Sequence, residues 1–115
     1  MGRLTEAETE MRTIIPQVLN FNEPHAVIAV AEDYGAILAG LGDSRKAVEL
    51  LAAADATRAR LGIARPPSQE RELAEPIAKA RLGLTEADWA AASAVASTTP
   101  VETVLADVYA SRAAT

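Results

Sequence analysis

Apolar residues recur at steps of three and four between residues 27 and 41, and this pattern constrains the fold most strongly. One face of an α-helix repeats at this spacing, whereas a β-strand alternates every second residue. The stripe consists of Val27, Val30, Ala31, Tyr34, Ile37, Leu38 and Leu41. It predicts a helix whose apolar face runs for about four turns.

A second apolar stripe follows after a short link. Gly42 and Asp43 interrupt the first stripe, Ser44 is placed to cap the next helix, and Gly62 is placed to end it in a left-handed conformation. The second stripe consists of Ala47, Leu50, Leu51, Ala54 and Leu61. Because so short a link favours antiparallel packing, residues 24–61 predict a central helical hairpin.

The segment before the hairpin predicts a first helix over residues 5–20. Thr5 and Glu8 have the spacing of a capping box, in which each side chain satisfies a backbone donor at the start of a helix. Pro16 removes one backbone hydrogen bond and crowds the preceding turn. We therefore expect this first helix to kink or stop near Pro16.

The segment after the hairpin predicts further helices over residues 68–111. A stiff Pro66-Pro67 pair precedes them, and Thr85 and Thr99 are placed to cap two of the helices. No segment alternates with period two. The chain is therefore expected to be a single all-α domain of five to six helices over residues 1–115.

The central hairpin also follows the spacing of a tetratricopeptide repeat. Gly35 lies twelve residues before Ala47, and Leu51 and Ala54 follow at the positions where the two helices of such a repeat pack. The repeat's usual final proline is replaced by Ala59. The hairpin therefore resembles a tetratricopeptide unit, which implies antiparallel packing with Gly35 close to Ala47.

A longer run of segments resembles one protein family. Leu-Gly-Asp at 41–43, Ala-Val-Glu-Leu-Leu-Ala-Ala-Ala-Asp at 47–55, Arg-Leu-Gly-Ile-Ala-Arg-Pro-Pro at 60–67 and Ala-Arg-Leu-Gly-Leu-Thr-Glu-Ala-Asp-Trp at 80–89 occur in that order. This order resembles the C-terminal tetratricopeptide-like region of large actinobacterial signalling-ATPase transcriptional regulators. Pro76 departs from that pattern. The resemblance implies a region that mediates protein contacts, senses signals and restrains a nucleotide-dependent switch.

Charge and composition exclude several classes of partner. Sixteen acidic against eleven basic residues give a formal net charge of −5. Since nucleic-acid affinity comes largely from Lys and Arg, we expect no direct nucleic-acid binding. The chain has no cysteine, no apolar run of about 20 residues and no apolar leader, so a cytoplasmic location without membrane contact is expected.

Residues that could carry catalysis are sparse. His25 is the only histidine, and its place after Pro24 at a helix start is more typical of a solvated side chain than of a base or metal ligand. Glu32 and Asp33 are interpreted as part of a solvated helix face. Gly40 and Gly42 do not complete a phosphate-binding loop. We therefore expect no enzyme activity, no metal and no cofactor.

A few residues are candidates for a partner or ligand surface. Arg58 and Arg65 belong to a basic cluster that either binds an anion or acidic peptide, or favourably meets the negative end of a helix dipole. Trp89 is balanced between a core and a contact role. With Tyr34 and Leu38, these residues make up the predicted surface.

Three functions follow from these observations. The first is a non-enzymatic interaction or regulatory module that binds a peptide, a protein or a copy of itself. The second is a small-molecule sensor with a pocket lined by Tyr34, Leu38, Trp89 and Val104. The third is an accessory subunit of an enzyme.

Self-association is a further hypothesis about the first helix. Met11, Ile15 and Val18 lie on its apolar stripe, and if the chain is complete we expect no preceding repeat for them to pack against. This predicts a homodimer through that face. The alternative is that the helix closes its own core and the protein stays monomeric.

Overall fold

The structure is a computed structural model that describes residues 2–113 and folds them into six α-helices. The helices are α1 (Gly2–Phe21), α2 (Pro24–Gly40), α3 (Ser44–Leu61), α4 (Pro67–Leu82), α5 (Glu86–Ser97) and α6 (Val101–Ala113). The predicted all-α fold with five to six helices is confirmed.

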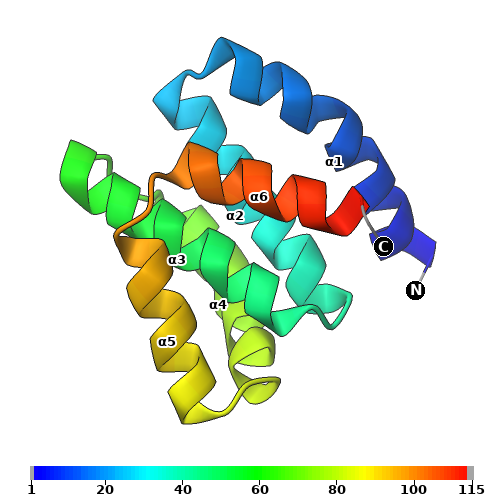
Figure 1. The fold of residues 1–115 in the computed structure, drawn as a ribbon, viewed down its shortest axis with the longest axis vertical. Helices are drawn as coiled ribbons and strands as arrows, with labels where there is room; N and C mark the ends of the chain where they lie inside the picture. The colour runs from blue at the N-terminus through cyan, green and yellow to red at the C-terminus, as the bar shows by residue number, and fades with distance from the viewer. Residues whose placement is uncertain (1, 114–115) are drawn as a thin grey trace.

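Helix α3 lies at the centre of the fold, where it packs against α2, α4, α5 and α6 (Figure 1). Helix α1 packs on the outside of α2 and also contacts α6. Helices α4 and α5 both pack on α3 but make few direct contacts with each other.

Contacts between α2 and α3 show in which direction the two helices run relative to each other. A Cβ atom added at Gly35 would lie 3.5 Å from the Ala47 carbonyl oxygen and 3.0 Å from Leu51 Cγ. Glu32, one turn earlier, bonds to Arg58, further along α3. The two helices are therefore antiparallel and cross closely at Gly35, where only a glycine fits without displacing Leu51. That this hairpin is a tetratricopeptide repeat stays a prediction.

Helix α1 begins three residues before the predicted residue 5 and ends one residue after the predicted residue 20. It begins at Gly2, so Thr5 lies inside the helix and does not cap it, and it continues past Pro16 to Phe21. The missing hydrogen bond of a proline inside a helix costs about 3 kcal/mol. Burial of Ile15 in the core, next to the proline, offsets that cost and keeps the helix continuous.

Glu8, expected in a capping box, instead joins three helices. Arg112 on α6 donates to both of its carboxylate oxygens, at 2.7 and 2.6 Å, and the Tyr34 hydroxyl on α2 donates to it at 2.8 Å. Nearby, the Arg12 guanidinium stacks 4.2 Å above the Tyr109 ring. These hydrogen bonds and the cation–π contact hold α1 against α2 and α6.

Two predicted helix boundaries are confirmed in detail. Gly62 ends α3 with a left-handed φ of 69°. The Thr85 side chain accepts a hydrogen bond of 3.1 Å from the Asp88 backbone N–H and so caps α5. Local turn chemistry was sufficient to place both ends.

Two other predicted caps are wrong. Asp43, not Ser44, caps α3, since its carboxylate accepts from the Lys46 backbone N–H at 3.4 Å. The Thr99 hydroxyl donates to the carbonyl oxygen of Val95 in the preceding helix, at 2.8 Å. Thr99 therefore does not cap α6, which begins at Val101. At the start of α3 both Asp43 and Ser44 have side chains that could cap the helix, and Asp43 holds the cap position.

Candidate functional site

The space between α4 and α5 is an open groove of about 540 Å³ whose floor is α3. Its lining is mostly apolar and comprises Val48, Leu51, Ala52, Asp55, Ala56, Ile77, Trp89, Ser93, Ala94 and Ser97. A groove of this size and chemistry lies within the range of ordinary ligand sites. It is the leading candidate functional site.

The spacing of the lining residues explains the shape of the groove. On α3 they recur at steps of three and four, and on α5 Trp89, Ser93 and Ser97 follow at steps of four, so each set forms a strip along one helix face. Along α3 the strip from Val48 to Ala56 covers two turns, about 12 Å. Many of the side chains that line the groove are alanine or serine, and their small size keeps the groove open.

Trp89 forms part of the wall on α5 and is half-buried. The guanidinium of Arg81, at the end of α4, lies 4.8 Å from the centre of its ring. Arg81 also reaches Glu86 at 3.5 Å, although both side chains are largely exposed. A cation over an indole ring is a weak contact at an exposed position, so it leaves the Trp89 ring accessible to another partner.

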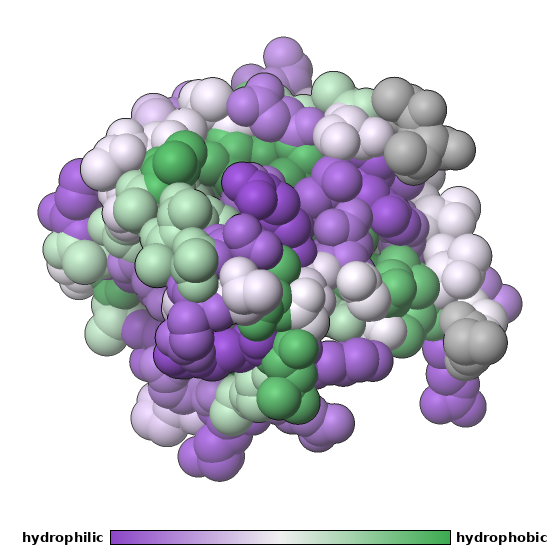
Figure 2. All heavy atoms as spheres, turned by 60° about the horizontal axis from the view of Figure 1, so that its bottom comes forward, coloured by the Kyte–Doolittle hydropathy of each residue, from purple (hydrophilic) through white to green (hydrophobic). Residues whose placement is uncertain are grey.

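Other apolar side chains on the surface are scattered. On the face that Figure 2 brings forward, apolar side chains gather in separate areas with hydrophilic side chains between them. Leu82 on α4 and Val95 on α5 are largely exposed, yet neither lines the groove. Single exposed apolar residues are normal for a globular protein, whereas the contiguous apolar lining of the groove is the more informative feature.

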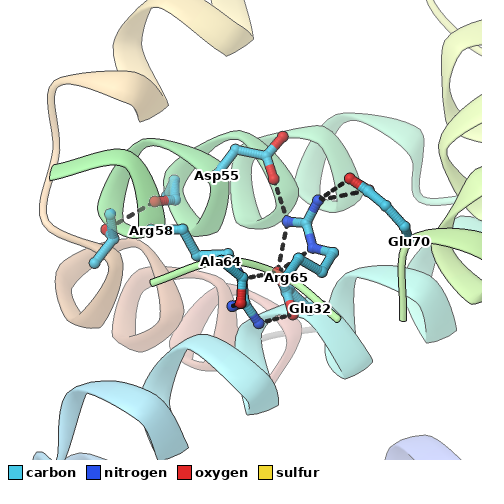
Figure 3. A network of polar contacts seen from close by, with 8 residues as sticks. Glu32, Asp55, Arg58, Ala64, Arg65 and Glu70 are labelled. Carbon is cyan, nitrogen blue, oxygen red and sulfur yellow. Dashed lines mark hydrogen bonds and ion pairs between the residues drawn. The ribbon is translucent and has the colours of Figure 1, made fainter. Parts of the chain in front are cut away.

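An ionic network around the buried Glu32 (Figure 3) shares one residue, Asp55, with the groove. Glu32 on α2 is fully buried, and Arg58 on α3 donates to both of its oxygens at 2.8 and 2.9 Å. Arg65, in the link before α4, donates to the same carboxylate at 2.9 Å and to Glu70 at 3.3 Å, and it also pairs with Asp55. The network thus joins α2, α3, α4 and the 62–66 link.

The charges in this network stabilise one another. Burial alone would raise the pKa of Glu32, but hydrogen bonds and charge from Arg58 and Arg65 outweigh it and lower that pKa below its usual value. Burial alone would likewise lower the pKa of Arg65, but its bonds to Asp55 and Glu32 raise it. Glu32 and Arg65 are therefore both ionised near neutral pH.

This network predicts a loss of stability in acid. Because the pKa of Glu32 is lower in the folded chain than in the unfolded chain, its contribution is fully present above the usual carboxyl pKa and is lost as the pH falls through the lowered value. We expect the free energy of unfolding to decrease below about pH 4, and to decrease less steeply in Glu32→Gln. Urea unfolding at a series of pH values measures both slopes, and equal slopes would contradict the assignment.

The predicted surface residues separate into three groups. Tyr34 and Leu38 are fully buried, so their prediction as a partner surface is wrong. Arg58 and Arg65 do lie together, but carboxylates of the same chain already occupy their donors. Trp89 lines the groove between α4 and α5, whereas Arg58 and Arg65 line a neighbouring hollow. The amphipathic character of Tyr34 misled the prediction, because its hydroxyl reaches Glu8 from inside the core.

The predicted small-molecule pocket is not formed by its four residues. Trp89 lines the groove, Val104 lines a separate hollow of about 250 Å³ beside α6, and Tyr34 and Leu38 are in the core. The prediction placed the last helix beside Trp89. In the structure α6 packs on α2 and α3 instead.

The predicted dimer face also changes. Ile15 is fully buried, so its prediction as a dimer contact is wrong. Met11 and Val18 are partly buried against the same core. The exposed apolar side chains of α1 are Ile14, 43% exposed, and Phe21, 74% exposed. Dimerisation itself stays a prediction.

The sequence interpretation missed Glu32 as a buried residue. It lies four residues after Ile28 and three before Gly35, both of which are buried, so it falls on the inner face of α2. The antiparallel pairing of α2 with α3 brings Arg58 opposite it. These two observations together, the periodicity and the hairpin register, could have identified the pair.

Residues suited to metal binding are dispersed. Within the part of the chain that the structure describes, His, Cys, Asp and Glu side chains form no group of three or more that could hold a metal ion. His25 is an exposed side chain whose Nδ1 lies 3.0 Å from the Glu23 carboxylate. Its solvated position agrees with the simpler interpretation of this histidine.

Among residues 2–113, none of the helices combines the length and the apolar character needed to cross a bilayer. Comparisons with protein-family models, with curated proteins and with solved structures find no match. The relation to signalling-ATPase regulators therefore stays a prediction from the sequence, and the function is argued from the groove.

Proposed function

We propose that this chain is a non-enzymatic interaction module that holds an apolar helical segment of a partner protein in the groove between α4 and α5. The single observation that carries the proposal is the contiguous apolar strip on α3, flanked by two helices that scarcely touch each other. Val48 and Leu51 are already buried, and a helix laid into the groove would cover the partly exposed Ala52 and Ala56 beside them. The regulatory role implied by the sequence resemblance is one setting for such a module.

The dimensions of the groove support a helix as its occupant. The strip from Val48 to Ala56 is about 12 Å long, and apolar side chains at positions i, i+4 and i+7 of a docked helix span about 10 Å. Small side chains at Ala52, Ala56 and Ser93 let a second backbone approach closely. The half-buried Trp89 supplies an aromatic contact of the kind that often dominates binding energy.

Trp89 also makes the proposal directly testable, because it is the only tryptophan in the chain. The probe is a library of helical peptides of about 18 residues that share a leucine stripe and have randomised flanks without Trp or Tyr. We expect selected peptides to bind with micromolar dissociation constants. They should shift Trp89 fluorescence to shorter wavelength, because the indole ring leaves water.

Two matched variants locate the binding. Ala94 lines the groove and Ala110 lies on α6 away from it, and both side chains are exposed. Ala94→Lys should weaken peptide binding about tenfold or more, since a docked helix would bury an unpaired ammonium group. Ala110→Lys changes the net charge equally and should bind like the wild type. Equal losses in both variants, or a library without binders, would contradict the proposal.

A second candidate function is the sensing of a small apolar molecule. The groove volume of about 540 Å³ favours it, because many small-ligand sites have this size. A ligand-dependent rise in melting temperature across a metabolite panel would support sensing. The same rise in Ala94→Lys would place the ligand elsewhere.

A further inference from the structure

We infer that the partner helix is basic at one end, with Lys or Arg side chains that lie beside Asp55 and Glu70. The inference rests on the proposed function, because it names the chemistry of the segment that the groove would hold. It comes from the charge balance at the end of the groove and from the shape of the surface beyond it.

The first observation is an unbalanced charge. The ionic network contains three carboxylates, Glu32, Asp55 and Glu70, against the two guanidinium groups of Arg58 and Arg65. The buried Glu32 accepts hydrogen bonds from both arginines. Within this network, Asp55 and Glu70 are therefore bonded to one arginine only, Arg65, whose remaining N–H groups they share. The side chains of Asp55 and Glu70 are 56% and 59% exposed, so their oxygens are accessible to another cation.

The second observation is the continuity of two hollows. Asp55 lines the apolar groove and also a neighbouring hollow of about 470 Å³, which Glu70 and Arg65 line as well. The apolar groove therefore leads, at Asp55, into a hollow lined by two exposed carboxylates and by Arg58 and Arg65, both of which already donate to the buried Glu32. A helix whose apolar stripe fills the groove would place its next turn over these groups.

Charge complementarity then selects the occupant. An acidic end would meet Asp55 and Glu70 with their negative charge only partly offset, and like charges across an interface disfavour binding. A basic end would supply the missing cation. The net charge of −5 acts in the same direction, because it attracts basic segments over a longer range at low salt.

The test uses two model peptides that share a leucine stripe and differ only at one end, which carries three lysines or three glutamates. We expect the lysine peptide to bind about tenfold more tightly at low salt, with the difference shrinking at high salt as charges are screened. Trp89 fluorescence reports both affinities.

Variants assign the preference to these carboxylates. Asp55→Asn and Glu70→Gln should each reduce the preference for the lysine peptide about threefold. Glu10→Gln, which removes an exposed carboxylate from α1, should leave it unchanged. Because Asp55→Asn also removes a partner of Arg65, thermal unfolding of each variant checks the fold, and Glu70→Gln carries the test if Asp55→Asn is unstable.

The outcomes distinguish the two proposals. Equal binding of both peptides with a shift in Trp89 fluorescence would overturn the charge inference and leave the interaction module intact. A preference that survives Glu70→Gln and Asp55→Asn unchanged would also overturn the inference. Failure of both peptides and of the library to shift Trp89 fluorescence would overturn the proposed function itself.

Discussion

Replacing Glu32 with alanine is expected to lower the free energy of unfolding by about 3–5 kcal/mol, because it leaves two buried arginines without their shared carboxylate. The Arg65 and Arg58 side chains are only 9% and 14% exposed, so water cannot fully replace the lost partner. Chemical denaturation in urea measures the change.

The neighbouring carboxylate is the matched control for this prediction. Asp33 follows Glu32 directly on α2 but is exposed. Asp33→Ala should therefore cost less than about 1 kcal/mol. Replacing Glu32, Arg58 and Arg65 together by apolar residues of similar size should recover much of the lost stability, since no unpaired charge remains. Similar losses for Glu32→Ala and Asp33→Ala would contradict the buried network.

A second large effect is expected at Ile15. Ile15→Ala should lower the free energy of unfolding by about 2–5 kcal/mol, because it removes a fully buried side chain and leaves a cavity between α1 and the core. Ile14→Ala is the control, since the adjacent isoleucine is 43% exposed and should cost less than about 1 kcal/mol. Equal losses would mean that α1 does not bury the face that carries Ile15 in the structure.

Packing and self-association of α1 are separated by comparing the buried Ile15 with the exposed Phe21. A charge at Ile15 would unfold the protein whether or not a dimer exists, so Ile15→Glu is not a test of dimerisation. Phe21→Glu changes a side chain that is 74% exposed and should preserve the fold. Sedimentation equilibrium of the wild type and of Phe21→Glu therefore tests a dimer through α1 without disturbing the core.

Contacts within one short segment were predictable because local chemistry determines them. The two stripes of the hairpin predict α2 and α3, Gly62 marks the end of α3 through its left-handed backbone, and Thr85 marks the start of α5 through a side-chain hydrogen bond. The close crossing at Gly35 follows from the same register. The charge at the end of the groove was not predictable from the sequence, because it depends on tertiary contacts of Arg65 with Glu32 on α2 and Glu70 on α4.

By itself, the sequence determined that the fold is all-α with five to six helices and that α2 pairs antiparallel with α3, because periodicity and a short link act over neighbouring residues. Tertiary structure alone decided that Pro16 stays inside a continuous helix and that Glu8 meets Arg112, a residue 104 positions away. It also decided that α4 and α5 diverge over α3 and leave a groove. The physical reason is that these features depend on contacts between distant segments, whose burial and ion pairing outweigh local helix preferences.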